Sequence, residues 1–260
     1  MKQRIQLLLG IVSLVALFTS CQKEITKKDD VPSAILPGQG TNCNIESLSI
    51  EPNTAGVHNH LIAYDEYQNP KFISSSDPTN IPVRTFKYDS WYRLREFRGE
   101  FPNGNFDSWH FYGYDNNGRL AIDTTYYSGK ITGDRPTTYS KAIISQSFYD
   151  AQGRVAHVIN QDMRFGFVTE EFYSYDANGN RVYPPGSGVV YDNKINLNRT
   201  NDLWQFLSKD YSMNNPFIAN AYNVAGYPTV INSEMQYDWL RSGYYVNHSI
   251  IGYSCHEAYY

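Results

Sequence analysis

Apolar and polar residues alternate along much of this chain with a period of two, which is typical of β-strands that bury one face. Residues 108–114 place His110, Tyr112 and Tyr114 on one face, and residues 120–126 alternate in the same way. Strands this close in sequence, joined by a short turn, pair antiparallel. The pattern therefore predicts a series of β-hairpins.

The predicted turns share one motif, Tyr-Asp-x-x-Gly, with crisp copies at 114–118 and 149–153 and an altered copy at 175–179. A type I turn favours Asp at its first position and Gly at its fourth. Gly also enters the left-handed conformation without a steric penalty. We therefore predict hairpin loops of a type I turn followed by a bulge. The turn residues are Asp115, Gly118, Asp150, Gly153, Asp176 and Gly179.

Weaker copies of the motif extend the repeat in both directions. Residues 222–226 have Asn in place of Asp, and Tyr64-Asp65 and Tyr88-Asp89 lack the Gly, so we expect different turns at these last two copies. The Tyr-Asp pairs recur about every 26 residues, which suits one hairpin and its return. The Arg after a turn is expected to cover a neighbouring ring or to pair with an Asp of the next hairpin.

Beyond Val182 the strand pattern gives way to loops and one short helix. Asn201 is a candidate N-cap, and apolar residues at helical spacing follow it, which predicts a helix near 201–207. Its Trp204 and Phe206 are expected to close an open end of the sheet. The chain is thus predicted to be all-β: an antiparallel meander of YD-type hairpins forming a curved or rolled sheet.

The N-terminus has the pattern of an export signal. Lys2 and Arg4 precede an apolar run, residues 5–18, which is too short to cross a membrane comfortably. Phe18-Thr19-Ser20-Cys21 resembles a bacterial lipoprotein lipobox, with Phe where Leu is usual. The resemblance implies cleavage before Cys21, leaving residues 1–20 as a signal peptide, and acylation of Cys21, which would anchor the chain in a membrane. A plain signal peptide with an incidental Cys is the alternative.

A flexible tether is predicted to follow over residues 21–44, which are polar, charged and rich in Pro and Gly. Residues 45–260 are then long enough for a single β-repeat domain. Gln22 is not the Asp that commonly retains lipoproteins at an inner membrane. We therefore expect an outer-membrane lipoprotein of the bacterial cell envelope, facing either the periplasm or the cell surface.

Composition and charge limit the classes of partner that we expect. The net charge is −4 with no basic patch, so nucleic acid is not expected as a partner. The 23 tyrosines suit half-exposed sheets better than helices. Cys43 and Cys255 lie at opposite ends of the domain, and an exported protein meets an oxidising compartment. The sequence leaves open whether these two residues form a disulfide or stay as separate thiols.

The Tyr-Asp-x-x-Gly-Arg-hydrophobic units resemble YD repeats of the RHS type. Together with the lipobox and the stretches at 191–194 and 211–216, the chain resembles small lipoproteins of Bacteroidetes-type bacteria with a YD-like domain of unknown function. The resemblance implies a rolled or meandering antiparallel sheet on the cell envelope. It implies no catalytic residues, and the chain is too short to form the shell that encloses a toxin in true RHS proteins.

The residues alone do not indicate an enzyme, a metal site or a cofactor. His58 and His60 have no further ligand at zinc spacing. Cys255 with His256 could be a nucleophile pair, and Glu170 with Glu171 a glycosidase pair. Neighbouring residues on a strand point to opposite faces, so the side chains of neither pair would meet.

Two functions compete, and an enzymatic role stays as a third alternative, which would need a pocket with converging ionisable side chains and shifted pKa values. The first is a monomeric, non-catalytic envelope lipoprotein whose sheet is a structural or protein-interaction surface. The alternative is a lipoprotein that binds a surface polysaccharide, with Trp91, Trp109 and Tyr92 as candidate glycan-binding residues. Trp204 and Trp239 complete the tryptophans, and packing in the core is the simpler explanation for all four.

Overall fold

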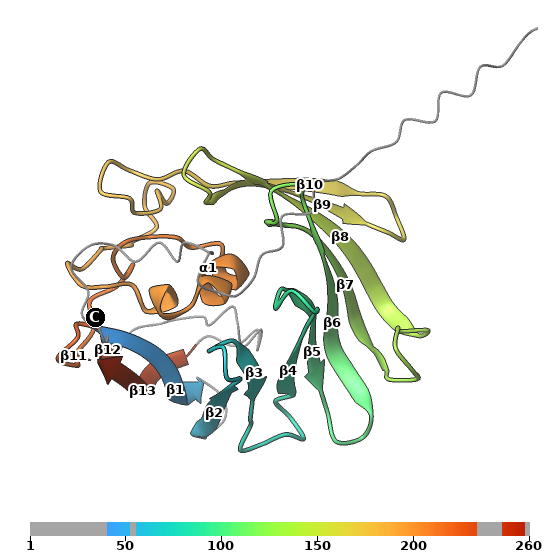
Figure 1. Cartoon of the computed structure of the whole chain (residues 1–260), viewed down its shortest axis with the longest axis horizontal. Helices are drawn as coiled ribbons and strands as arrows, with labels where there is room; N and C mark the ends of the chain where they lie inside the picture. The colour runs from blue at the N-terminus through green and yellow to red at the C-terminus, as the bar shows by residue number, and fades with distance from the viewer. Residues whose placement is uncertain (1–40, 53–55, 233–245, 258–260) are drawn as a thin grey trace, which may run out of the picture. The chain divides into compact units, whose positions relative to one another are not determined.

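The computed structural model describes residues 41–52, 56–232 and 246–257. Antiparallel strands dominate, which confirms the predicted meander (Figure 1). The strands are β1 (Thr41–Pro52), β2 (His58–Tyr64), β3 (Pro70–Ile73), β4 (Val83–Tyr88), β5 (Leu94–Glu100), β6 (Asn105–Tyr114), β7 (Leu120–Lys130), β8 (Tyr139–Tyr149), β9 (Val155–Asp162), β10 (Val168–Phe172), β11 (Ala221–Tyr222), β12 (Pro228–Ile231) and β13 (Val246–Glu257). Two short helical segments, η2 (Leu197–Thr200) and α1 (Asp202–Ser208), complete the described elements.

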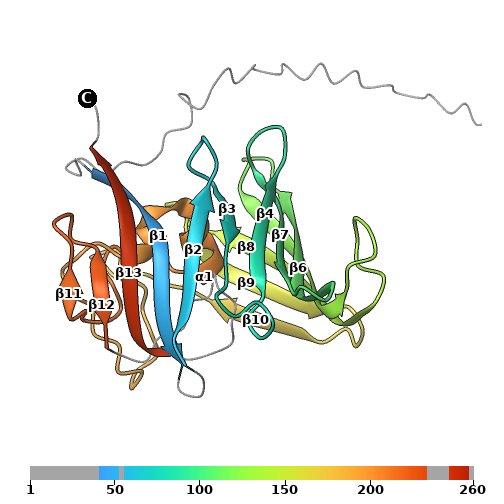
Figure 2. The same ribbon diagram turned by 90° about the horizontal axis from the view of Figure 1, so that it is seen from below.

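All 13 described strands belong to one sheet, in the order β10-β9-β8-β7-β6-β5-β4-β3-β2-β1-β13-β12-β11. The strands from β1 to β10 each pair with the next along the chain, as hairpins require. The C-terminal strand β13 returns to pair with β1, and Figure 2 shows it between β1 and β12. The sheet does not close, so β10 and β11 are its two edges.

Three predicted boundaries change. β1 begins at Thr41, so it takes the last four residues of the stretch assigned to the tether. The alternation of residues from Phe165 to Tyr175 in the sequence predicts one long strand there. The structure has only β10 in this stretch, because a turn at 163–165 precedes it. The sequence also predicts a final strand over 243–253; residues 243–245 lie outside the described residues, and the described strand, β13, continues to Glu257.

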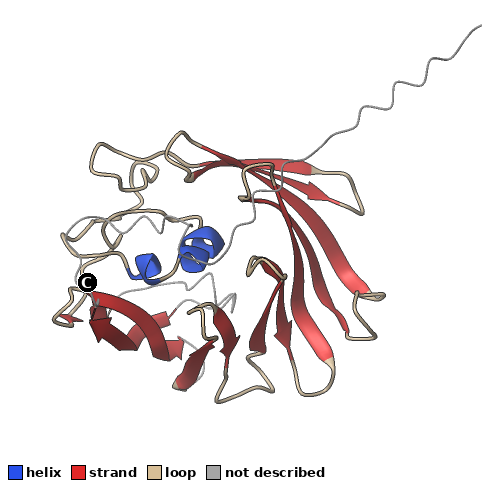
Figure 3. Cartoon of the chain, viewed as in Figure 1, coloured by secondary structure: helices blue, strands red, loops and turns tan. Residues whose placement is uncertain are grey.

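The sheet curves, and α1 lies on its concave side (Figure 3). The predicted N-cap forms, since the Asn201 side chain accepts a hydrogen bond from the backbone N–H of Leu203. Trp204 is fully buried and meets the Phe86 ring of β4 edge-on at 5.9 Å between centroids. Phe206 meets Tyr112 of β6 at 6.0 Å. The expectation that these rings close an end of the sheet is wrong: they fill its concave face.

The predicted hairpin turn is present at each crisp copy. The N–H of Gly118 donates to the carbonyl of Asp115 at 3.0 Å, and the N–H of Asp115 donates to Arg119 at 2.9 Å. Gly118 has φ +75, the left-handed conformation that the bulge requires. The turns at 150–154, 176–180 and 223–227 have the same pair of hydrogen bonds.

The expectation of different turns at the two copies without Gly is wrong. Residues 65–69 and 89–93 make the same two backbone hydrogen bonds. Gln68 and Tyr92 take the left-handed position, with φ 64 and 57. This conformation costs an L-residue roughly 1–2 kcal/mol. The Asp side chain stabilises the turn independently of Gly: Asp89 Oδ1 accepts from the backbone N–H groups of Trp91 and Arg93.

Side chains tie each turn to the next hairpin. Arg119 Nε donates to Asp115 Oδ2 at 2.8 Å, so the Arg pairs with the Asp of its own turn rather than with the next one. Its guanidinium lies 4.5 Å above the ring of Tyr149, as the other alternative predicted. The Tyr149 hydroxyl donates to the carbonyl of Leu120 at 2.6 Å. The same cation–π contact joins Arg93 to Tyr114 and Arg154 to Tyr175.

The tyrosines that precede these turns, which we call the tyrosine ladder, are half-buried. Burial raises the pKa of Tyr88, Tyr114 and Tyr149 far above the ordinary value, and it raises that of Tyr175 to about 12. Each hydroxyl is therefore held in its neutral, hydrogen-bonding form.

A disulfide joins the first and last strands of the domain. Cys43 on β1 lies directly opposite Cys255 on β13, with Cα atoms 4.0 Å apart, and their sulfurs are bonded. The sequence leaves open whether these cysteines form a disulfide or stay as separate thiols, and the structure has the disulfide. Because the two cysteines are 212 positions apart in the sequence, the bond closes nearly the whole domain.

Candidate functional site

The concave face of the sheet changes character between its two halves. Over β1 to β5 its buried residues are mainly apolar, among them Leu48, Ile62, Phe86 and Phe97. From β6 onward hydroxyls, amides and carboxylates replace them. The polar side chains come from facing positions of neighbouring strands: Ser108 and His110 on β6, Asp123 and Thr125 on β7, Ser145 and Ser147 on β8, Asn160 on β9, and Thr169 and Glu171 on β10.

These side chains, except that of His110, line a trough of about 650 Å³, which we call the concave trough. The volume lies within the range of about 300–1,000 Å³ that is usual for ligand sites. The C-terminal end of α1 forms one wall, through Leu207, Ser208 and Lys209. Val158 adds an apolar patch to the lining.

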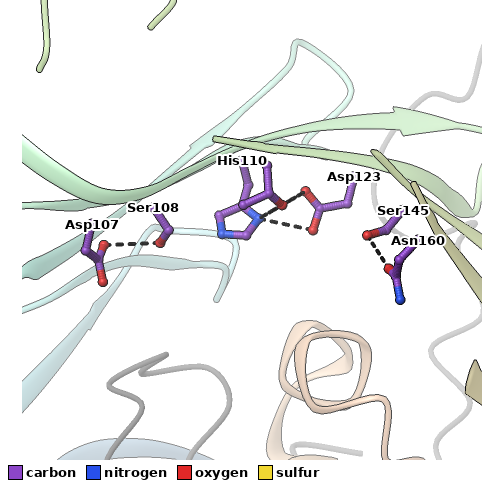
Figure 4. A network of polar contacts seen from close by, with 7 residues as sticks. Asp107, Ser108, His110, Asp123, Ser145 and Asn160 are labelled. Atoms are coloured by element: carbon purple, nitrogen blue, oxygen red, sulfur yellow. Dashed lines mark hydrogen bonds and ion pairs between the residues drawn. The ribbon is translucent and has the colours of Figure 1, made fainter. Parts of the chain in front are cut away.

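A hydrogen-bonded chain of side chains orients the polar groups of the trough. Ser145 Oγ donates to Asn160 Oδ1 at 2.6 Å, and Asn160 Nδ2 donates to Glu171 Oε1 at 2.9 Å. The hydroxyl of Tyr173 donates to the other oxygen of Glu171 at 2.6 Å. Figure 4 shows Ser145 and Asn160 in a row with the polar residues of β6 and β7.

The second polar cluster of the trough centres on a buried histidine. Nδ1 of His110 lies 3.0 and 3.1 Å from the two carboxylate oxygens of Asp123 (Figure 4). Thr125 Oγ1 lies 2.8 Å from the same Nδ1 and donates to Asp123 Oδ1. A catalytic relay requires the acid on one ring nitrogen and the nucleophile on the other. Here both partners lie on Nδ1, so these three residues do not form that relay.

Charges in and around the trough nearly balance. Its carboxylates are Asp107, Asp123 and Glu171, and its cations are Arg181 and Lys209. Arg84, which is 1% exposed, forms an ion pair with Asp107 at 2.5 Å. The guanidinium occupies space that a side chain at position 99 would take, since a Cβ on Gly99 would lie 1.6 Å from Arg84 Nη1.

A second surface, at the sheet edge, is apolar. All five residues of β10 are exposed. Phe165 and Phe167, in the connection from β9, are 62% and 71% exposed, and Phe172 is 74% exposed. Phe172 stacks on His157 at 4.3 Å between centroids. We call this surface, formed by Phe165, Phe167, Val168 and Phe172, the apolar hairpin.

The predicted glycan-binding residues separate in the structure. Trp91 and Tyr92 lie at a turn tip and are 57% and 49% exposed. Tyr92 packs on Tyr67 of the preceding turn at 4.1 Å, and their hydroxyls are 2.8 Å apart. Trp109 is fully buried beneath Arg98, so its assignment as a glycan-binding residue is wrong. Trp204 is also buried, and Trp239 lies outside the described residues.

The remaining candidates lie apart. His58 and His60 are buried on one face of β2, and Nδ1 of His60 bonds the carbonyl of Ser74 at 2.7 Å. Desolvation lowers the pKa of His60, so its ring is held neutral. Glu170 pairs with His157 on one face of β10 while Glu171 lines the trough on the other. Within the described ranges, no three potential ligands gather as a metal site requires.

Cys21, the predicted lipidation site, lies outside the described residues. In the part of the chain that the structure covers, no helix is long and apolar enough to span a membrane.

Sequence reasoning missed the concave trough. The signal was present in the alternation: Ser145, Ser147 and Asn160 stand at positions of β8 and β9 where a buried face would carry apolar residues. Comparison of the chain with protein-family models and with curated proteins gave no match in either case.

Proposed function

We propose that this chain is a lipoprotein of the bacterial outer membrane whose β-repeat domain is a non-catalytic protein-interaction module. The positive N-terminus, the short apolar run and Cys21 support the membrane anchor. The arrangement around His110 fits a non-catalytic role, because Asp123 and Thr125 both contact its Nδ1 and so do not form a relay across the ring.

The apolar hairpin is the observation that carries the interaction role. Large apolar side chains that are 55–74% exposed along an edge strand mark an interaction site in a soluble domain. An edge strand also presents backbone groups that can pair with another chain. Natural edge strands commonly carry lysine or proline against such pairing, and β10 (Val-Thr-Glu-Glu-Phe) has neither, although it carries two glutamates.

The anchor is tested by labelling growing cells with an alkyne fatty acid. We expect the label on the full chain and none on Cys21→Ser, with the wild type alone in the outer-membrane fraction. An unlabelled wild type, or a labelled variant, would contradict the anchor.

The interaction is tested with a photo-crosslinking amino acid in living cells. Placed at Phe167, it should give a discrete crosslinked product that Phe172→Asp weakens. Val224, which is fully exposed at a turn tip, is the matched control and should give none. Equal products at the two positions would refute the apolar hairpin as the interaction surface.

Glycan binding is a second candidate, and the aromatic cluster of Tyr67, Trp91 and Tyr92 favours it. Tyr92, like Gln68, holds a left-handed backbone where the other turns of the repeat have Gly, and such strain concentrates at functional sites. Trp91→Ala should abolish retardation of the full chain in polysaccharide-containing native gels. Gln152→Ala, at the same position of another turn, should not. Unchanged retardation of Trp91→Ala would exclude this cluster.

A further inference from the structure

We propose that the concave trough is a binding site for a neutral, polyhydroxylated ligand, a short saccharide. The inference goes beyond the protein-interaction role, because the apolar hairpin and the trough use different side chains. It also differs from glycan binding at the turn tips, since none of Tyr67, Trp91 and Tyr92 lines the trough.

The polar lining is not what the fold needs. Ser108, Asp123, Thr125 and Ser147 of the lining are buried, whereas Ser145 and Asn160 are half-buried and Thr169 and Glu171 are exposed. Burying a hydroxyl or a carboxylate costs free energy unless it is hydrogen-bonded, and apolar side chains would pack the buried positions better. Over β1 to β5 the same face is buried mainly with Leu, Ile and Phe, together with His58, His60 and Arg84. The change to Ser, Thr, Asn and Asp from β6 onward is therefore explained by a ligand more readily than by stability.

The donors and acceptors of the trough are already oriented. Asn160 is fixed on one side by Ser145 and on the other by Glu171, which Tyr173 holds in turn. Oriented groups lose little freedom when a ligand binds, which raises affinity. Carboxylates and side-chain amides in such rows suit the paired hydroxyls of a sugar ring, because each oxygen accepts more than one hydrogen bond.

Charge and apolar contacts select the class of ligand. The three carboxylates of the trough are matched by Arg84, Arg181 and Lys209, so the site has no net charge to attract an ion. The apolar faces of Val158 and Leu207 suit the C–H face of a sugar ring. These features together favour a neutral saccharide over an anion, a cation or an apolar molecule.

The test measures saccharide binding by the full chain in an amine-oxide detergent, because glycosidic detergents would compete. The probes are neutral hexasaccharides of glucose, xylose, mannose and N-acetylglucosamine, with hexagalacturonate as the anionic counterpart. Thr169 is exposed and lines the trough, so Thr169→Trp should fill it. Gln161→Trp is the matched control, because Gln161 lies beside it on the opposite face of the β9–β10 pair.

We expect at least one neutral probe to bind with a Kd below about 1 mM, and Thr169→Trp to weaken it about tenfold or more. Gln161→Trp should leave the Kd unchanged, and circular dichroism should show both variants folded. Asn160→Ala should weaken binding in the same direction without filling the trough.

Three results would overturn the site. They are the absence of binding by every neutral probe, a preference for hexagalacturonate, and binding that Thr169→Trp does not weaken. Binding that is lost only in Trp91→Ala places the sugar at the turn tips instead. The crosslinking at Phe167 is a separate measurement, so the protein-interaction role can stand or fall independently.

Discussion

Replacing Gly153 by Ala isolates the conformational requirement of the repeated turn. Gly153 has φ +78, and a Cβ placed on it meets no atom within 4 Å. The added methyl group therefore clashes with nothing beyond its own backbone. Any loss of stability in Gly153→Ala reports the cost of a left-handed residue in this turn.

The expected magnitude follows from two opposing effects. A left-handed backbone costs an L-residue roughly 1–2 kcal/mol. Replacing Gly by Ala also removes freedom from the unfolded chain, which returns about 0.4–1 kcal/mol. The net loss in the free energy of unfolding should be about 1 kcal/mol. Gly153→Asn should lose less, because Asn tolerates the left-handed region.

Gly129→Ala is the contrasting variant, because its cost is steric. A Cβ on Gly129 would lie 2.0 Å from the carbonyl oxygen of Thr138 and 2.6 Å from the ring of buried Phe106. Backbone and ring must both shift, and forcing extra atoms into packed positions costs about 1–3 kcal/mol. We expect Gly129→Ala to be the least stable of the three variants.

Urea unfolding of the oxidised full chain, followed by tyrosine and tryptophan fluorescence, measures these differences. The order of stability should be wild type, Gly153→Asn, Gly153→Ala and Gly129→Ala. If Gly153→Ala is as stable as the wild type, or if Asn is no better than Ala, then the left-handed residue does not limit this turn.

Three further predictions concern the tyrosine ladder, which includes Tyr88, Tyr114 and Tyr149, and the disulfide. Tyr149→Phe removes the hydroxyl that donates to Leu120 and should cost about 1 kcal/mol in urea unfolding, whereas Tyr139→Phe, at an exposed ring, should cost nothing measurable. Because burial raises the pKa values of Tyr88, Tyr114 and Tyr149 above 10.0, their contribution to stability is complete below that pH and lost as pH rises above it. Tyrosinate absorbance should therefore rise cooperatively with alkaline unfolding, and independent titration near pH 10 would refute this. Reducing Cys43–Cys255 should lower the free energy of unfolding by up to about 5 kcal/mol in the chain-entropy view, and a Cys43→Ser/Cys255→Ser variant should match the reduced protein; equal stability before and after reduction would contradict that view.

Local chemistry made the hairpins predictable. Asp115 and Gly118 specify a type I turn and bulge through contacts within five residues, so the motif indicates its own structure wherever it occurs. The same reasoning failed at Gln68 and Tyr92, because it treated Gly as a requirement. The Asp side chain accepts hydrogen bonds from the turn backbone whether or not Gly is present, and the turn then holds a residue with a Cβ in the left-handed conformation.

Aromatic residues were harder to place from the sequence. Trp91 and Trp109 are the same residue type, but Trp91 lies at an exposed turn tip and Trp109 is fully buried. Burial depends on which strands and loops cover a face, and the period of two indicates only that two faces exist. The apolar hairpin likewise depends on β10 being an edge, which the order of strands alone determines.

The sequence by itself determined the antiparallel hairpins, their turns and the short capped helix, because these rest on hydrogen bonds between residues close along the chain. Only the tertiary structure decided that β13 returns to β1, that Cys43 meets Cys255, and that Ser145, Asn160 and Glu171 form one row. These juxtapositions join residues on separate strands, and the curvature and register of the whole sheet set them. No local propensity encodes such contacts, which is why the concave trough emerged only with the fold.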